Sequence, residues 1–161
     1  MKIAIIYASK YGTTEKVADS IAEKLKETNE EVEMFSLNKN ANPNISGFET
    51  VILGSSIYAG QVSKKMKAFC RKNESVLLQK KTGLFVCGMH PDKAEQEKEL
   101  KNAYSEVLQK NASAIGFLGG AYLFEKMIFF ERMIIKKIAK TTTSVHQIDY
   151  EAVDVFVGKL K

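Results

Sequence analysis

The sequence predicts a doubly wound α/β fold, in which helices cover both faces of a parallel sheet. Five short apolar runs rich in β-branched residues indicate strands, and amphipathic segments with a 3.6-residue period lie between them. The strand-like runs are apolar almost throughout, which is typical of strands buried on both faces. Strands that alternate with helices are joined by right-handed crossovers, so we expect neighbouring strands to run parallel.

The predicted elements follow in chain order. The strands cover residues 2–7, 31–35, 50–54, 83–88 and 114–121. The first helix follows the first strand directly, because its apolar stripe begins at Val17 and recurs at Ile21 and Leu25. Further stripes predict helices around residues 62–70, 100–108 and 152–160, the second of which includes Val107. Asp149 stands before the last stripe in the position of an N-cap.

The composition predicts a single domain, residues 1–161, because 45% of the residues are hydrophobic and the chain can bury a substantial core. No repeat, low-complexity tract or proline-rich linker divides it. The longest apolar stretches are shorter than the roughly 18 residues that span a bilayer, and "MKIAIIYASK" runs directly into a strand-like segment without an extended h-region or cleavage site. We therefore expect a cytoplasmic protein.

The ionisable residues narrow the classes of ligand. Cys70 and Cys87 match neither a C-x-x-C motif nor a disulfide framework, so we expect reduced thiols. The two histidines and the dispersed carboxylates predict no metal site. The net charge of +5 is compatible with an anionic cofactor or an anionic membrane surface, and no charge pattern indicates nucleic-acid recognition.

The turn after the first strand, "ASKYGTTEK", has the residues of an anion cradle. Ser9, Thr13 and Thr14 supply hydroxyl groups, and Gly12 lets the backbone approach a ligand closely. The unpaired N–H groups of the following helix point at whatever occupies the turn. The alternative is that these residues only cap the helix. The position of the turn favours the cradle, because ligands of open α/β sheets bind at the carboxyl ends of the strands.

Other phosphate motifs do not fit this turn. It contains neither the G-x-G-x-x-G pattern of a dinucleotide site nor the G-x-x-x-x-G-K-[ST] pattern of a P-loop. A phosphorelay receiver would need acidic residues at the end of the first strand, and residues 1–10 include none. A neutral, hydroxyl-lined cradle suits a phosphate monoester, and FMN is such a ligand.

Three segments together resemble the flavodoxin superfamily. "SKYGTT" is similar to its phosphate loop, with Tyr11 in place of the middle hydroxyl residue, "GSSIYAGQ" (54–61) to its flavin-contacting loop, and "CGMHPDKAE" (87–95) to the segment on the other side of the ring. The resemblance implies a five-stranded sheet in the order 2-1-3-4-5 with FMN at the switch point. The FMN contacts that it implies are Ser9, Lys10, Tyr11, Gly12, Thr13, Thr14, Ser55, Ser56, Ile57, Tyr58, Ala59, Gly60, Cys87, Gly88, Met89 and His90.

Three of these residues have a simpler interpretation as well. Tyr58 either stacks on the isoalloxazine ring or is a partly exposed loop tyrosine. Cys87 either has a redox role or is a small core residue. His90 either donates to the cofactor or caps the helix that starts near Asp92.

The C-terminal third, with a basic and aromatic insert at residues 122–148, is similar to the menaquinone-dependent protoporphyrinogen dehydrogenases. In the second loop the basic residue of that family is absent, and Gln61 replaces its histidine. A helical period over residues 125–140 places Phe129 and Met133 among basic residues, and this segment has a net charge of +3. Such a face predicts contact of residues 124–140 with an anionic membrane or an electron-transfer partner. The alternative is that another segment or a second copy of the chain covers it.

These observations lead to a ranked expectation of function. The first is an FMN-dependent dehydrogenase or quinone-coupled oxidoreductase, cytoplasmic or peripheral to the inner face of the membrane, with a quinone or another redox partner. The alternative is a soluble flavodoxin-type electron-transfer protein, and the third is a cofactor-free partner-binding module. No residue is identified as catalytic.

Overall fold

The computed structural model describes residues 2–10, 12–58, 61–88, 93–122 and 145–161. Its elements are β1 (Lys2–Ala8), α1 (Thr13–Lys26), β2 (Glu31–Ser36), β3 (Thr50–Tyr58), β4 (Gln61–Val62), α2 (Lys64–Leu77), β5 (Lys81–Cys87), α3 (Lys93–Ala103), α4 (Glu106–Asn111), β6 (Ala114–Phe117), β7 (Gly119–Tyr122), β8 (Val145–Ile148) and α6 (Tyr150–Leu160).

The main sheet has the strand order β2-β1-β3-β5-β6, and all four of these pairings are parallel. Counted along the five parallel strands, this is the predicted order 2-1-3-4-5. In the described part of this sheet β4 alone is antiparallel, paired with the end of β3, and β7 and β8 form a separate antiparallel pair. The prediction of a doubly wound α/β fold is therefore confirmed.

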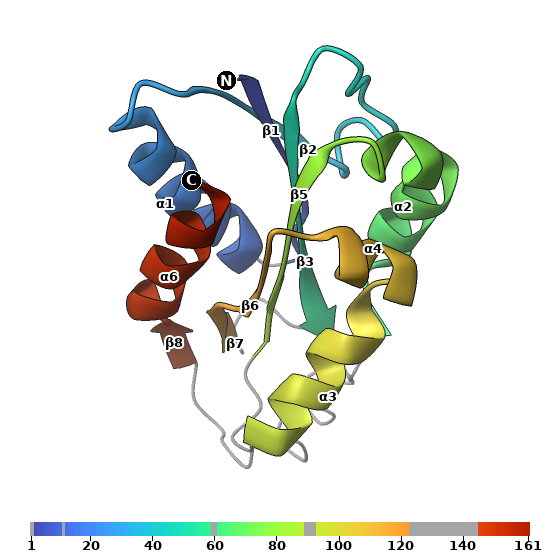
Figure 1. The fold of residues 1–161 in the computed structure, drawn as a ribbon. Coiled ribbons are helices and arrows are strands. Elements are labelled where there is room, and N and C mark those ends of the chain that lie inside the picture. The colour runs from blue at the N-terminus through green and yellow to red at the C-terminus, as the bar shows by residue number, and fades with distance from the viewer. Residues whose placement is uncertain (1, 11, 59–60, 89–92, 123–144) are drawn as a thin grey trace.

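Helices cover both faces of this sheet, with α1 and α6 on one side and α2, α3 and α4 on the other (Figure 1). Alternate residues of β1 face opposite layers, so Ile5 packs beneath α1 while Ile6 packs with Met66 of α2. The side chains of Ile5 and Ile6 are both fully buried. This two-sided burial explains why the strand sequences lack polar alternation.

A glycine in β3 makes room for an aromatic side chain of the α1/α6 layer. A Cβ atom on Gly54 would lie 1.9 Å from the ring of Phe85, so this ring lies directly against the β3 backbone. The Phe85 ring also packs edge to face on Phe156 of α6, with ring centroids 5.9 Å apart. The glycine thus lets the Phe85 side chain of β5 lie on the β3 backbone, beneath α6.

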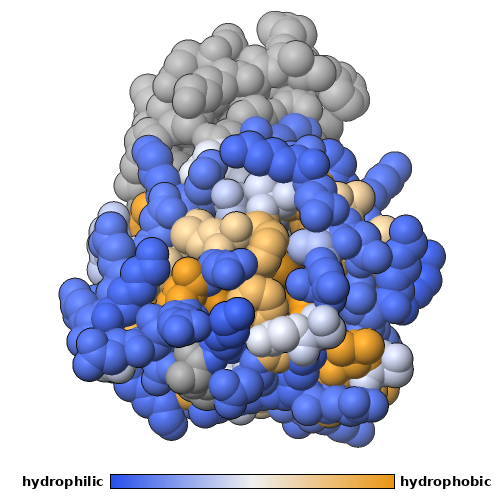
Figure 2. Space-filling model, turned by 90° about the horizontal axis from the view of Figure 1, so that it is seen from above, coloured by the Kyte–Doolittle hydropathy of each residue, from blue (hydrophilic) through white to orange (hydrophobic). Residues whose placement is uncertain are grey.

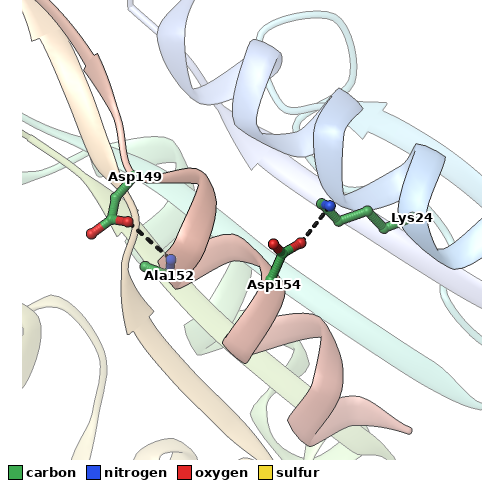
Figure 3. Close-up of polar contacts among 4 residues, drawn as sticks. All are labelled: Lys24, Asp149, Ala152 and Asp154. Atoms are coloured by element: carbon green, nitrogen blue, oxygen red, sulfur yellow. Dashed lines mark hydrogen bonds and ion pairs between the residues drawn. The ribbon is translucent and has the colours of Figure 1, made fainter.

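The start of α6 confirms the predicted N-cap. The Asp149 carboxylate accepts the N–H of Ala152 at 2.9 Å, and Asp154 of α6 pairs with Lys24 of α1 (Figure 3). The cap satisfies one of the helix's free donors. The ion pair is partly exposed to solvent, so it orients the two helices and adds little stability.

Several predicted boundaries were wrong. Predicted strand 50–54 continues to Tyr58, because Ile57 is buried and pairs with Val62. Predicted strand 114–121 is divided at Leu118, after which β7 leaves the main sheet and pairs with β8. The single helix predicted around residues 100–108 is two helices, because Ser105 caps a new one through the N–H of Leu108.

That break also reverses the predicted burial of one residue. Val107 is 49% exposed, although the helical stripe placed it inside. Tyr104, at the break, is buried, and its hydroxyl oxygen lies 2.8 Å from the carbonyl oxygen of Phe85 and 3.1 Å from that of Leu53. These contacts attach the α3–α4 connection to β3 and β5.

The predicted insert is only partly described. Its two ends are paired in a hairpin, with Tyr122 opposite Val145, and residues 123–144 lie outside the described residues. The docking face predicted for residues 124–140 lies outside them too. No helix in the part of the chain that the structure describes is long and apolar enough to cross a bilayer. Seen from the amino ends of the strands, the molecule is covered mainly by hydrophilic residues around a smaller apolar area (Figure 2).

The buried hydroxyl of Tyr104 gives a prediction about stability. We expect Tyr104→Phe to lower the free energy of unfolding of the apoprotein by about 1 to 3 kcal/mol, because a buried polar contact to strand carbonyls is lost. Tyr150→Phe is the matched control, since Tyr150 is 59% exposed and should change stability little. Urea denaturation measures both. Equal stability of the two variants would contradict the anchoring role.

Candidate functional site

The turn after β1 has a backbone conformation that glycine favours. Gly12 has φ = 91° and is the N-cap residue of α1. Its N–H donates to the hydroxyl oxygen of Ser9 at 2.9 Å. An added Cβ would meet no atom within 4 Å, so the left-handed backbone, and not crowding, explains the glycine. The turn therefore has open space beside it.

The start of α1 has N–H groups without helical acceptors. The N–H of Lys16 donates to the Gly12 carbonyl and is the first intrahelical bond. The N–H groups of residues 13–15 precede it, and the structure records no side-chain cap for them among the residues it describes. The N-cap position belongs to Gly12, so Thr13 and Thr14 lie inside the helix. The free donors and the helix dipole favour an anion in the turn.

One hydroxyl in this turn is buried without a partner. Thr14 is fully buried, and its Oγ1 makes no hydrogen bond. Burial raises the pKa of the neighbouring Cys87 thiol, and a side-chain interaction with Thr14 has a smaller, lowering effect on it. Burial of an unsatisfied hydroxyl costs about 1 to 3 kcal/mol, so a ligand oxygen that reached Thr14 would recover that cost.

The acidic residue in the first turn of α1, Glu15, already has a hydrogen-bonding partner. The Glu15 carboxylate accepts the Tyr7 hydroxyl at 3.3 Å. Burial, and after it the charge of Glu15, raise the pKa of Tyr7, so the phenol stays protonated and available as donor. Glu15 is therefore held by β1.

The second predicted segment lies mostly in β3. The Ser55 hydroxyl is buried, donates to the Ser56 carbonyl at 3.1 Å and accepts the Ser63 N–H at 3.2 Å, so it fastens β3 to the start of α2. Ile57 is part of the core. Tyr58 ends the strand opposite Gln61. The Tyr58 side chain and residues 59–60 lie outside the described residues.

The third predicted segment begins at the end of β5. Cys87 is buried, and burial raises the pKa of its thiol to about 12, which agrees with the core interpretation and not with a redox role. The N–H of Gly88 donates to the Gly119 carbonyl at 2.9 Å, so the start of this segment is held by β7. Met89 and His90 lie outside the described residues.

Strand register brings the three segments to one edge. Ala8 is paired with Ser55 across β1 and β3, and Ser56 with Cys87 across β3 and β5. The chain leaves all three strands at this carboxyl edge, which is where open α/β sheets bind ligands.

A cleft of about 530 Å³ opens beside the turn after β1, a volume typical of small-molecule sites. Its lining residues are Ala8, Ser9, Lys10, Asn38, Ser56, Val62, Ser63, Lys64 and Lys65. Ser9, Lys10 and Ser56 were predicted, whereas the other six, Ala8, Asn38 and the run 62–65, were missed from the sequence. The sequence did contain a signal for the run 62–65. A helix that begins at the carboxyl edge of the sheet directs its free N–H groups to a ligand there, and this applies to α2 as well as to α1. Among the described residues no group of His, Cys, Asp or Glu could hold a metal ion.

Both cysteines should be unreactive in the folded protein. Burial raises the pKa of the Cys70 thiol to about 12, as it does for Cys87, so both are neutral at pH 8. We expect a thiol-specific disulfide reagent to label neither in native protein over minutes and both in guanidinium. Fast labelling of Cys87 in the native state would revive its redox interpretation.

Comparisons with known proteins agree with this architecture. The curated protoporphyrinogen IX dehydrogenase [quinone] of Escherichia coli is 22% identical over 99% of this chain and 94% of its own length. Its namesake in Leishmania major is 24% identical over 88% of this chain and 63% of its own length.

Solved structures show the same fold. Flavodoxin 1 of Bacillus cereus has a TM-score of 0.53 and 27% identity, covering 74% of this chain and 82% of that one. The flavodoxin of Streptococcus pneumoniae TIGR4 has a TM-score of 0.64 and 17% identity, covering 99% and 97%. The flavodoxin domain family matches residues 4–149, nearly the whole chain. This protein therefore belongs to the flavodoxin domain family.

Proposed function

We propose that this protein binds FMN at the carboxyl edge of its sheet and acts as an oxidoreductase. The observation that carries the proposal is the turn after β1, where the uncapped N–H groups of residues 13–15 and the buried, unpartnered Thr14 hydroxyl lie together. A phosphate monoester supplies acceptor oxygens for all of these donors. Membership of the flavodoxin domain family supports the same ligand.

The residues fit FMN better than a dinucleotide. The turn has one glycine, whereas a bound pyrophosphate needs the closer backbone approach that several glycines allow. Ser9 holds the turn closed by accepting the Gly12 N–H. Ser56 lies at the end of β3 and lines the adjoining cleft, so it is placed to contact the phosphate or the ribityl chain.

Bound FMN would supply the redox chemistry, and the protein would supply binding, orientation and charge. The segments that follow β3 and β5 would enclose the ring, Tyr58 from one side and residues 88–90 from the other. Buried Cys87 would remain a neutral thiol beneath them. Thr14 and Cys87, both buried on the α1 side of the sheet, would exclude water from below the turn.

For the reaction we favour a quinone-coupled dehydrogenase. The relatives named protoporphyrinogen IX dehydrogenase [quinone] cover nearly the whole chain, which supports this class. The net charge of +5 supports it too, because low-potential electron carriers of the superfamily are typically acidic. The likeness to flavodoxins supports the alternative, a soluble electron carrier.

The insert would bring the electron acceptor to the flavin. Its two ends are paired as Tyr122 with Val145, and β7 is tied to the end of β5 through Gly88 and Gly119. The insert therefore leaves the fold beside the proposed ring site. We place the protein in the cytoplasm, with residues 124–140 touching an anionic membrane at its inner face.

Titration of the apoprotein tests the cofactor. We expect tight binding of FMN and far weaker binding of FAD and NAD. Thr14→Val should weaken FMN binding at least tenfold, because a charge-assisted hydrogen bond is lost. Thr82→Val is the matched control, since Thr82 is also fully buried with an unpartnered hydroxyl but lies in β5 near its amino end.

Both valine variants should melt at the temperature of the unsubstituted apoprotein or higher, because neither loses a hydrogen bond and each removes a buried hydroxyl without a partner. If FAD bound as tightly as FMN, or if the two variants bound FMN alike, the assignment of the turn would be wrong.

Turnover separates the two functions. We expect the FMN-loaded protein to oxidise protoporphyrinogen with a menaquinone analogue as acceptor. Phe129→Ser combined with Met133→Ser should slow the reaction with quinone in anionic vesicles and leave the reaction with a water-soluble quinone unchanged. Electron transfer to protein partners without turnover of protoporphyrinogen would instead establish the electron carrier.

A further inference from the structure

The cleft beside the turn is positively charged, whereas the sequence predicted a neutral cradle lined by hydroxyl groups. Lys10, Lys64 and Lys65 line it, and the described lining residues include no Asp or Glu. Two of these lysines open α2, whose first turn has no acidic residue. A helix dipole disfavours cations at its amino end, so this placement destabilises the start of α2 unless an anion is near.

Lys65 is held toward the turn by a neutral side chain. Its ammonium group donates to Oδ1 of Asn38 at 3.2 Å, and Nδ2 of Asn38 donates to the Ser9 carbonyl at 2.7 Å. The amide orients the lysine without neutralising it, as a carboxylate would. One side chain therefore links the charge at the start of α2 to the turn after β1.

The backbone around these lysines is also fixed. The Ser63 hydroxyl accepts the Lys65 N–H at 3.2 Å and so caps α2, and the Ser63 N–H donates to the buried Ser55 hydroxyl of β3. The first turn of α2 is thus fastened to the strand that adjoins β1. Both lysines are thus carried by a backbone that these hydrogen bonds fix at the edge of the cleft.

We propose that Lys65, positioned by Asn38, and Lys64 bind the phosphate dianion of FMN from the cleft, adding charge to the hydrogen bonds of the turn. This inference rests on the proposed function. It assigns a role to Asn38, Lys64 and Lys65, which the resemblance did not identify as cofactor contacts. It predicts that affinity for FMN, but not for riboflavin, depends on these lysines and on salt, because riboflavin lacks the phosphate.

The test is titration of apoprotein with FMN and riboflavin at low and high salt. We expect Lys65→Gln and Lys64→Gln each to weaken FMN binding about five- to tenfold at low salt. Riboflavin binding should not change, and the loss for FMN should shrink in about 1 M salt, where charges are screened beyond roughly 3 Å. Lys72→Gln on α2 is the control, because Lys72 is exposed and does not line the cleft.

Two further variants separate charge from shape. Lys65→Arg should keep most of the FMN affinity, whereas Asn38→Asp should lower it, because the new carboxylate neutralises Lys65. Apoprotein of Lys64→Gln and Lys65→Gln should melt at the same temperature as the unsubstituted protein or higher, since a cation at the helix start is removed.

Equal FMN affinities for the Lys64, Lys65 and Lys72 variants would overturn this inference alone, as would equal losses for FMN and riboflavin. Failure of the unsubstituted protein to bind FMN would overturn the proposed function and this inference with it.

Discussion

The pairing of β1, β3 and β5 as adjacent parallel strands is the constraint on which the candidate site depends. Parallel neighbours end at the same edge, so segments more than thirty residues apart in the chain meet there. The order β2-β1-β3-β5-β6 reverses at β1, and α1 leaves that strand toward one face while α2 leaves β3 toward the other. The amino ends of both helices are thereby directed to one edge, where the cleft lies between the start of α2 and the turn that precedes α1.

This convergence explains the electrostatic character of the site. The start of α1 offers N–H groups and a buried hydroxyl without partners, and the start of α2 offers two ammonium groups. The first turn of α1 includes Glu15, whose carboxylate accepts the Tyr7 hydroxyl, whereas the first turn of α2 has no acidic residue to compensate the helix dipole. A phosphate group at this edge would supply acceptors for the donors of α1 and negative charge for the start of α2.

The sequence predicted the architecture well because its signals were local and repeated. Apolar runs identified five parallel strands, and Asp149 identified the start of α6. Boundaries failed where tertiary contacts decided them. Ile57 extended β3 through burial and pairing with Val62, and the Tyr104 contacts broke a helix that the stripe of residues 100–108 had predicted as continuous. Around the site, the turn after β1 could be predicted, and the start of α2 offered a signal for Lys65. Asn38 could not be predicted, because only the fold brings the turn after β2 between Ser9 and Lys65.

The central claim is that the turn after β1 and the neighbouring lysines hold a phosphate as its dianion. Phosphorus-31 NMR of the FMN complex, followed from pH 5 to pH 8.5, tests this most directly. Free FMN titrates with a phosphate pKa near 6. Donors and positive charge that favour the dianion should depress that pKa, so we predict a bound resonance that does not shift over this range. A bound resonance that titrates as in free FMN would place the phosphate in solvent and contradict the account.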